Sequence, residues 1–367
     1  MTEKRYRIEH FKAKSLEMNP LSSPVERDIS VYLPPEYYED SSNSYPVIYY
    51  LHGYGGNHHQ WTVTSKFSKD GQIQIDLIPK NVLERINLDR LVFFEKLDEE
   101  ILSSSLRPFI FVQPDASLHI PNIYELKNQR GEITPKGSFY VNSPYTGNYR
   151  DYIVKDVIGY IDKTFRTIPD RAHRAIMGGS MGGYGTIHII SHHPKLFSVA
   201  VALSPGNFEH KSRLNMKMIN PLMEEMVGTE MATILGERTL KDILDTCDLI
   251  FSKEEPLLPT LKFDDTGELI DYNQKAFDNW KKYGLVKMAE TFANNLKQVK
   301  FLINCEENDE FRIHESTQRI HDALLTLGVD HEFEIYSDSK AKISPHALGI
   351  GYHLLPGIEY CLENLGE

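Results

Sequence analysis

The 367-residue sequence predicts an α/β fold, with one eight-stranded, mostly parallel sheet flanked by helices. Three observations lead to this class. Short β-rich runs alternate with helical patterns along the chain. Several of these runs, such as VIYYL at 47–51 and FIFV at 109–112, are apolar without interruption, as strands buried on both faces are. Glycine-bearing turns follow directly after several runs, at Leu51, Met177 and Leu203.

The predicted strands are Tyr6–Ala13, Arg27–Leu33, Val47–Leu51, Phe109–Gln113, Arg174–Met177, Ser198–Leu203, Val299–Asn304 and Glu332–Tyr336. The clearest helix is Arg150–Phe165, whose apolar side chains recur at helical spacing on one face. A second helical pattern covers Tyr184 to His192.

Two intervals between strands are too long for simple connections. One is 57–107, between the third and fourth strands, and the other is 206–298, between the sixth and seventh. We expect 1–205 and 299–367 to form the core, and 206–298 to form a helical cap. Ligands bind at the carboxyl edge of such sheets, so the cap would lie over that edge.

The composition of the chain argues against several classes of protein. The net charge of −12 argues against a nucleic-acid partner, because phosphates would be repelled. No apolar run approaches the length of a membrane span or of a signal peptide. Cys247, Cys305 and Cys361 are too widely spaced for a disulfide framework or a CxxC metal motif. These features predict a cytoplasmic protein without a membrane partner. The oligomeric state stays open, a homodimer being one option.

The strongest local signal is GGSMGGYG at 178–185, which contains G-x-S-x-G between a strand and a helical pattern. In α/β-hydrolases this motif is the nucleophile elbow, a tight turn that presents the serine hydroxyl above the sheet. The alternative is a glycine-rich turn or a phosphate cradle, but no G-K-[ST] follows to complete a P-loop. We therefore predict Ser180 as a nucleophile.

The third predicted strand ends in LHGYGG at 51–56. The loop at this position supplies one backbone N–H of the oxyanion hole in α/β-hydrolases, and the residue after the nucleophile supplies the other. The candidates are the N–H groups of Tyr54 and Met181. His52 is expected to orient the loop. His58 and His59 are not expected to bind a metal, because adjacent side chains on a strand or helix point in different directions.

An acid and a histidine should follow the last strands, in the order Ser, Asp/Glu, His. The acidic run CEENDEF at 305–311 offers four carboxylates, of which Asp309 is preferred and Glu306 is the alternative. His346 lies in the loop after the last predicted strand, whereas His353 falls within an apolar helical pattern. We predict His346 as the general base. This chemistry requires no cofactor and no metal.

Several segments together resemble the Putative esterase family, which contains feruloyl esterases, S-formylglutathione hydrolases, enterochelin esterases and mycolyltransferases. The segments are VIYYLHGYGG with Trp61 following, GSFYVNSP with GNY following, RAIMGGSMGGYG, HHPKLFSVAVALSPG and the stretch from His346 to Leu365. In the family Leu-Pro follows the catalytic histidine by nine and ten residues, as Leu355-Pro356 follow His346 here. The acid commonly precedes a polar–aromatic pair, like Glu310-Phe311.

The resemblance implies a serine carboxylic-ester hydrolase that acts on a small-molecule ester through an acyl-enzyme. The departures are Cys305 for a family glycine, Leu348 for an aromatic residue and a longer 206–298 insertion. Similarity to feruloyl esterases favours a bulky or aromatic acyl group. The predicted substrate-binding residues are Tyr140, Asn142, Tyr145 and Trp280. An acyltransferase with the same triad and a non-catalytic binding protein are the alternatives.

Overall fold

The computed structural model describes residues 5–61, 93–118, 136–207, 224, 228–251, 261–263, 269–342 and 344–366. Its centre is an eight-stranded sheet in the order β1-β2-β4-β3-β7-β8-β11-β12. The strands are β1 (Tyr6–Lys12), β2 (Glu26–Tyr32), β3 (Val47–Leu51), β4 (Ile110–Pro114), β7 (Arg174–Gly179), β8 (Val199–Leu203), β11 (Lys300–Glu306) and β12 (Glu332–Tyr336). The eight predicted strands are confirmed, with ends that differ by one or two residues.

Six of the strands, from β4 to β12 in the sheet, run parallel to one another. β1 and β2 add an antiparallel edge next to β4. The chain adds β4 on one side of β3 and then crosses to add β7 on the other side. Such a reversal of direction opens a crevice at the carboxyl ends of the two strands that flank it. Here these are β3 and β7, which precede the LHGYGG loop and the predicted elbow.

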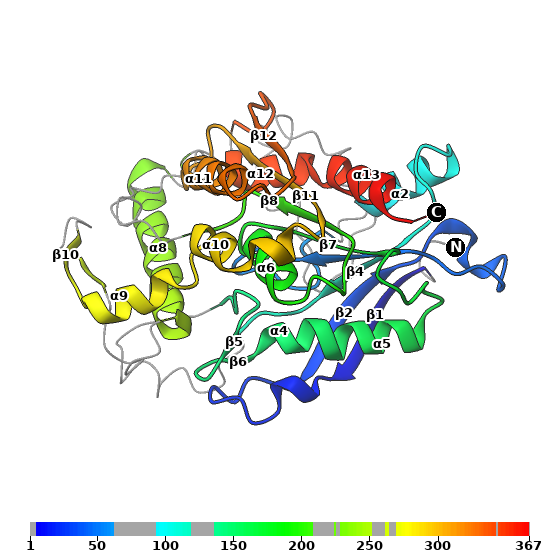
Figure 1. Ribbon diagram of the computed structural model, residues 1–367, viewed down its shortest axis with the longest axis horizontal. Helices are drawn as coiled ribbons and strands as arrows, with labels where there is room; N and C mark the ends of the chain where they lie inside the picture. The colour runs from blue at the N-terminus through cyan, green and yellow to red at the C-terminus, as the bar shows by residue number, and fades with distance from the viewer. Residues whose placement is uncertain are drawn as a thin grey trace.

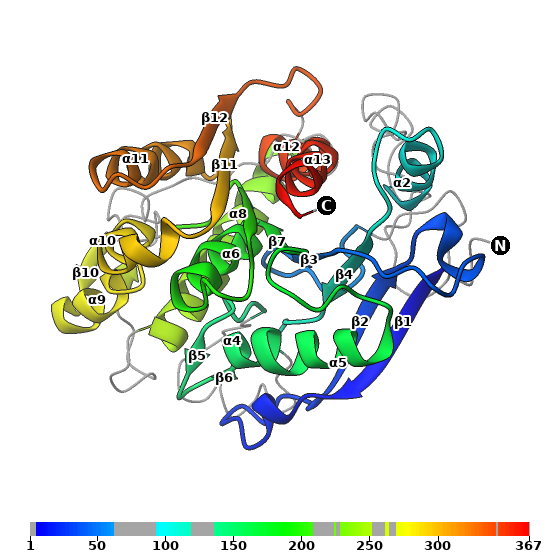
Figure 2. The ribbon, with the colours of Figure 1, turned by 45° about the vertical axis from the view of Figure 1, so that its right-hand side comes forward.

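Helices cover both faces of the sheet (Figure 2). One layer contains α5 (Ile158–Thr164), α6 (Met181–His192), α10 (Leu285–Leu296) and α11 (Ile313–Thr326). The other contains α2 (Phe93–Leu102), α12 (Pro345–Tyr352) and α13 (Leu354–Asn364). β3 shows why both layers are needed. Tyr49 packs into the first layer and Tyr50 into the second, and both are fully buried.

The predicted helix Arg150–Phe165 is confirmed as a continuous helical segment. It consists of α4 (Tyr149–Asp151), a π-helical stretch η6 (Tyr152–Val157) and α5. Ile153, Val157 and Ile161 on its apolar face are fully buried against the sheet. The predicted Tyr184–His192 helix begins three residues earlier, at Met181, because the elbow turn feeds directly into it.

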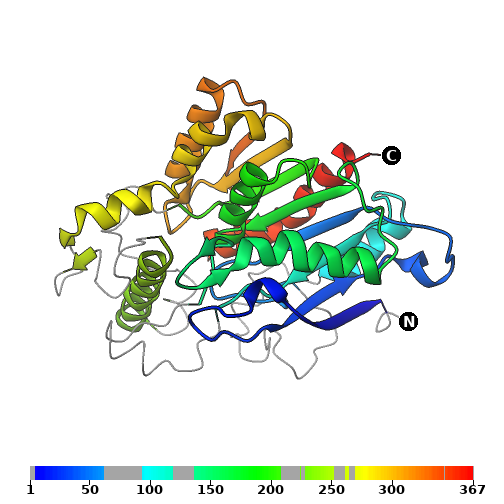
Figure 3. The same ribbon diagram turned by 60° about the horizontal axis from the view of Figure 1, so that its bottom comes forward.

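Between β8 and β11 the chain forms α8 (Thr229–Phe251), β9 (Leu261–Phe263), β10 (Leu269–Tyr272), α9 (Gln274–Lys281) and α10. α8 and α9 stand at one end of the molecule, beyond α6 and α10 (Figures 1 and 3). α10 packs against α6 and α11. None of the helices in the described part of the chain is long and apolar enough to cross a membrane.

The short elements are the paired strands β5 (Asn142–Ser143) and β6 (Gly147–Asn148), and the 3₁₀ helices η2 (Lys14–Leu16) and η3 (Pro35–Tyr38). β5 and β6 lie in the segment that leads into α4 (Figure 1).

Candidate active site

Ser180 occupies a strained turn between β7 and α6. Its backbone has φ 57° and ψ −117°, a conformation that non-glycine residues rarely adopt. Neighbouring backbone groups hold the turn. The Ser180 N–H donates to Leu203 O over 2.9 Å, and the N–H groups of Tyr184 and Gly206 donate to Ser180 O over 3.0 and 2.9 Å. Hydrogen bonds with β8, with the turn after it and with the start of α6 therefore hold Ser180 in its strained backbone conformation.

The two glycines that flank the serine in G-x-S-x-G are required by the space around them. A Cβ on Gly182 would lie 1.8 Å from Leu51 O, and one on Gly178 would lie 2.5 Å from the Gly182 backbone. No side chain fits at either distance. The motif read from the sequence thus reflects the close approach of α6 to the ends of β3 and β7.

Asp309 and His346 come together from the loops after β11 and β12. The Asp309 Oδ2 and His346 Nδ1 atoms are 2.6 Å apart, and both side chains are buried. The other carboxylate oxygen, Oδ1, accepts the Phe311 N–H over 2.9 Å. A carboxylate so placed accepts the Nδ1–H of the imidazole, which leaves Nε2 as its free basic nitrogen.

Glu306 and His353, the other candidates for the acid and the base, both make contacts that support the fold. Glu306 Oε2 accepts the Asp338 N–H over 2.9 Å, so this carboxylate ties the loop after β11 to the loop after β12. His353 stacks on Tyr336 with ring centroids 3.5 Å apart, and its Nδ1 lies 3.3 Å from Asn304 Nδ2. The described contacts of neither residue involve Ser180.

A second carboxylate, that of Glu310, supports His346. Glu310 Oε2 accepts the His346 N–H over 2.7 Å. Burial lowers the pKa of His346, but the charge of Asp309, its hydrogen bond and the charge of Glu310 together raise that pKa above its ordinary value. Burial, together with the charge of Asp309, raises the pKa of Glu310. His346 is thus an imidazole whose charged form two carboxylates stabilise.

Ser180 and His346 both line one cavity of about 180 Å³. The remaining lining is largely apolar and comes from the LHGYGG loop and the turn after it, the segment before β5, the start of α6, the turn after β8, the interior of α8, the start of α11 with the loop before it, and α12. These residues are Gly53, Tyr54, Gln60, Trp61, Phe139, Met181, Gly206, Ile243, Phe311, Ile313, Ala347 and Ile350. The carboxyl edge of the sheet thus opens into a pocket with a serine and a histidine on its wall.

The LHGYGG loop lies directly against the elbow. A Cβ on Gly53 would be 3.6 Å from Ser180 Cβ. The Gly53 N–H donates to Gln60 Oε1 over 2.7 Å, whereas no described contact involves the next N–H along the loop, that of Tyr54. Met181 is the first residue of α6, where backbone N–H groups have no acceptor within the helix. Both predicted donors therefore belong to backbone that borders Ser180.

His52 holds the loop as predicted. Its Nε2 accepts the Ala116 N–H over 3.0 Å, so its proton is on Nδ1, which donates to Gly53 O over 2.9 Å. Burial lowers the pKa of His52, which keeps this neutral form. Tyr140 acts on the same loop from the other side, because its hydroxyl donates to His52 O over 2.9 Å.

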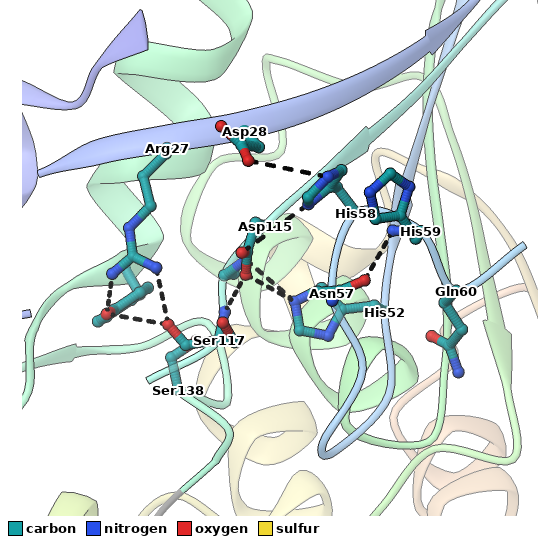
Figure 4. A network of polar contacts seen from close by, with 12 residues as sticks. Arg27, Asp28, His52, Asn57, His58, His59, Gln60, Asp115, Ser117 and Ser138 are labelled. Carbon is teal, nitrogen blue, oxygen red and sulfur yellow. Dashed lines mark hydrogen bonds and ion pairs between the residues drawn. The ribbon is translucent and has the colours of Figure 1, made fainter. Parts of the chain in front are cut away.

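His58 and His59 lie in a turn, and their ring centroids are 3.8 Å apart. The expectation that the two side chains point in different directions was wrong, because it assumed a strand or a helix. The His58 ring lies between two carboxylates, 3.9 Å from Asp28 and 3.9 Å from Asp115 (Figure 4). Over the described residues, no group of three or more His, Cys, Asp or Glu side chains is arranged to hold a metal ion.

The four predicted substrate-binding residues are absent from the described lining of this cavity. Tyr140 supports the loop through His52, and the Asn142 side chain donates to Asp151 over 2.8 Å. The Tyr145 N–H donates to Ser143 Oγ over 3.2 Å. Trp280 lines a separate cavity of about 10 Å³, which shares Phe139 and Gly206 with the larger one.

Sequence reasoning missed Gln60, Phe139, Ile243 and Phe311 as lining residues. Two signals were present, since Gln60 follows the LHGYGG loop closely and Phe139 stands beside Tyr140. Ile243 lies far from every motif, on α8, and only the fold brings it to the pocket.

A side-chain contact joins the LHGYGG loop to α8. The hydroxyl of Tyr54 lies 2.8 Å from Thr246 Oγ1 and donates to Asp242 O over 3.0 Å. Burial raises the pKa of Tyr54, so the hydroxyl keeps its proton. Tyr54, whose backbone N–H is one of the two predicted oxyanion donors, is thus anchored to α8 through its side chain.

Comparison with known proteins agrees with this architecture. The family model described as “Putative esterase” matches residues 22–320, a range that includes Ser180 and Asp309 and ends before His346. A ferulic acid esterase structure is similar over 98% of both chains, with 18% identity and a TM-score of 0.58. The S-formylglutathione hydrolase of Staphylococcus aureus covers 97% of this chain and 98% of its own, with 15% identity and a TM-score of 0.53.

A curated relative is also similar in sequence. The endo-1,4-beta-xylanase/feruloyl esterase of Xylanibacter ruminicola is 28% identical over 184 residues. The match takes in 49% of this chain but only 19% of the relative's own length. The structural likenesses show the α/β-hydrolase fold, and the family model covers most of the chain. The chain therefore belongs to the Putative esterase family.

Proposed function

We propose that the chain hydrolyses carboxylic esters through a Ser180-His346-Asp309 triad and an acyl-enzyme. One observation carries the proposal. Ser180 and His346 line the same cavity, and the buried carboxylate of Asp309 lies 2.6 Å from the Nδ1 atom of His346. Nucleophile, base and orienting acid then stand in the order that acyl transfer requires.

The reaction has two steps. His346 Nε2 takes the proton of Ser180 Oγ as the oxygen attacks the ester carbonyl carbon, and the imidazolium then protonates the departing alcohol. Water enters, gives a proton to the same nitrogen and attacks the acyl carbon, and the acid leaves as Ser180 regains its proton. Asp309 stabilises the imidazolium in both steps. The raised pKa of His346 fits this role, because the surroundings favour the charged form.

The backbone N–H groups of Tyr54 and Met181 would bind the carbonyl oxygen as it becomes negative. Both belong to backbone beside Ser180, and the positive end of the α6 dipole lies at the same place. Donors fixed before the reaction stabilise the oxyanion without reorganisation. The strained backbone at Ser180 is consistent with this arrangement, since nucleophile elbows of α/β-hydrolases combine such a turn with an oxyanion donor at the next residue.

The lining of the cavity favours an ester with a bulky apolar or aromatic acyl group. Trp61, Phe139 and Phe311 contribute aromatic surface, and Ile243 and Ile313 contribute aliphatic surface. Pockets with this lining bind apolar groups by removing them from water. Similarity to proteins named as ferulic acid and feruloyl esterases supports the same class.

We also propose that 206–298 acts as a cap through α8. Ile243 of α8 lines the cavity, and Thr246 one turn later binds the hydroxyl of Tyr54. A substrate that contacts α8 can therefore affect the position of the Tyr54 backbone N–H through the hydrogen bond between Thr246 and Tyr54. The sequence of this segment has five methionines from Met216 to Met231, a residue type that forms adaptable surfaces, and their side chains lie outside the described residues.

Replacing triad residues tests the proposed chemistry. Ser180→Ala and His346→Ala should each lower kcat for a short p-nitrophenyl ester by roughly a thousandfold or more. The matched control is His353→Ala, which removes a histidine from the same chain segment and should keep most of kcat. Circular dichroism would verify folding. Comparable losses in His353→Ala and His346→Ala, or an active Ser180→Ala, would contradict the assignment.

Glu310→Gln tests the electrostatic support of the base. Glutamine keeps an oxygen for the His346 N–H but removes the charge that helps raise the pKa of His346. The base works when neutral, so a lower pKa lets it work at lower pH. The acidic limb of kcat/KM against pH should shift to lower pH while the plateau stays near wild type. A limb that stays in place, or shifts to higher pH, would refute this role.

Thr246→Val tests the contact between α8 and the oxyanion loop. Valine has the shape of threonine but cannot bind the Tyr54 hydroxyl. A neutral hydrogen bond contributes about 1 kcal/mol, so kcat should fall by up to roughly fivefold. Ser143→Ala is the control, because the Ser143 hydroxyl binds α8 at Ile250 O without contacting the loop. An unchanged kcat in Thr246→Val, or an equal fall in both variants, would show that this contact does not position the loop.

A further inference from the structure

Gln60 is a polar side chain in the active-site cavity with no part in the mechanism described so far. It lies in the turn after the LHGYGG loop, half-buried, and lines the same cavity as Ser180 and His346. Its carboxamide points away from the Asp28–His58–Asp115 network (Figure 4). Gln60 therefore belongs to the cavity wall rather than to that network.

One hydrogen bond fixes the orientation of the Gln60 amide. The Gly53 N–H donates to Gln60 Oε1 over 2.7 Å. A carboxamide has one acceptor atom and one donor atom, and a backbone N–H can bind only the acceptor. The other end must be the Nε2 group, with two N–H donors. Within the described part of the chain, no acceptor binds Nε2.

The Nε2 group lies close to the predicted nucleophile. A Cβ on Gly53 would be 3.4 Å from Gln60 Nε2 and 3.6 Å from Ser180 Cβ. Both atoms therefore border the space that the absent side chain of Gly53 leaves open.

The apolar surroundings of Gln60 Nε2 give its N–H donors a free-energy cost unless a ligand accepts a hydrogen bond from them. The described cavity wall is mostly apolar. A polar group that faces apolar surface without a hydrogen-bond partner raises the free energy of the folded protein. A bound ester would displace water from the cavity and bring oxygen atoms to this region. An ester oxygen is an acceptor and satisfies the Nε2 donor.

We propose that Gln60 is a further catalytic residue, whose Nε2–H donates to the carbonyl oxygen of the bound ester beside the N–H groups of Tyr54 and Met181. The inference rests on the proposed ester hydrolysis at Ser180. Oε1 holds the oxyanion loop through Gly53, and Nε2 contacts the substrate. One side chain thus positions a backbone donor and adds a donor of its own.

Two substitutions separate these two contributions. Gln60→Glu keeps a carboxylate oxygen for the Gly53 N–H but has no Nε2 donor, and Gln60→Met has neither group. A donor to the developing oxyanion acts in the transition state, so both variants should lower kcat at least roughly tenfold while KM changes little. The substrate is the same short p-nitrophenyl ester, and thermal unfolding verifies that each variant folds.

The matched control for the added charge is Asn57→Asp. Asn57 is exposed in the same turn, and its Oδ1 accepts the His59 N–H, which an aspartate also does. Asn57→Asp should keep kcat within about twofold of wild type, because exposed charges are screened.

Three outcomes would overturn the role of Gln60: wild-type kcat in Gln60→Glu, a rise in KM at unchanged kcat, or an equal fall in Asn57→Asp. The first would leave Gln60 as a support of the loop alone. Ser180→Ala in the same assay separates this failure from that of the proposed function. An inactive Ser180→Ala beside a fully active Gln60→Glu refutes only the donor, whereas an active Ser180→Ala refutes both.

Discussion

The buried hydrogen bond between Asp309 Oδ2 and His346 Nδ1 determines what the carboxyl edge of the sheet can do. It joins the loops after β11 and β12, which are also connected by the contacts of Glu306 with the Asp338 N–H and of Glu310 with the His346 N–H. Because Asp309 accepts the Nδ1–H, the proton stays on Nδ1 and Nε2 is left as the basic nitrogen of His346. Without that bond, His346 would be a buried histidine with a pKa lowered by burial and no reason to act as a base at Ser180.

A second constraint is the support of the LHGYGG loop. His52 ties it to the end of β4, Tyr140 holds it from the segment before β5, and Gln60 holds Gly53 from the following turn. Tyr54 anchors it to α8. Four contacts from separate parts of the chain thus fix a few backbone atoms beside Ser180. Such support is what a donor must have if it is to stabilise a developing charge without moving.

The sequence predicted the sheet well because its strands are buried on both faces, and uninterrupted apolar runs such as 47–51 have few alternatives. The tight turn around Ser180 was also predictable, since glycines at 178 and 182 are forced by contacts under 3 Å with neighbouring backbone. The structure brings Asp309 and His346 together, as expected. The structural role of Tyr140 was not predictable, because nothing in the surrounding sequence indicates that its hydroxyl donates to His52 O instead of lining the cavity. Residues such as Ile243 reach the pocket only through the long-range placement of α8.

The most direct measurement of the central claim is mass spectrometry of the protein stopped during turnover of a p-nitrophenyl ester. We expect a chain heavier by one acyl group minus a hydrogen, with the added mass on the peptide that contains Ser180. His346 variants should not accumulate this species. An acyl group attached to another residue, or turnover through a mechanism that never acylates Ser180, would contradict the account.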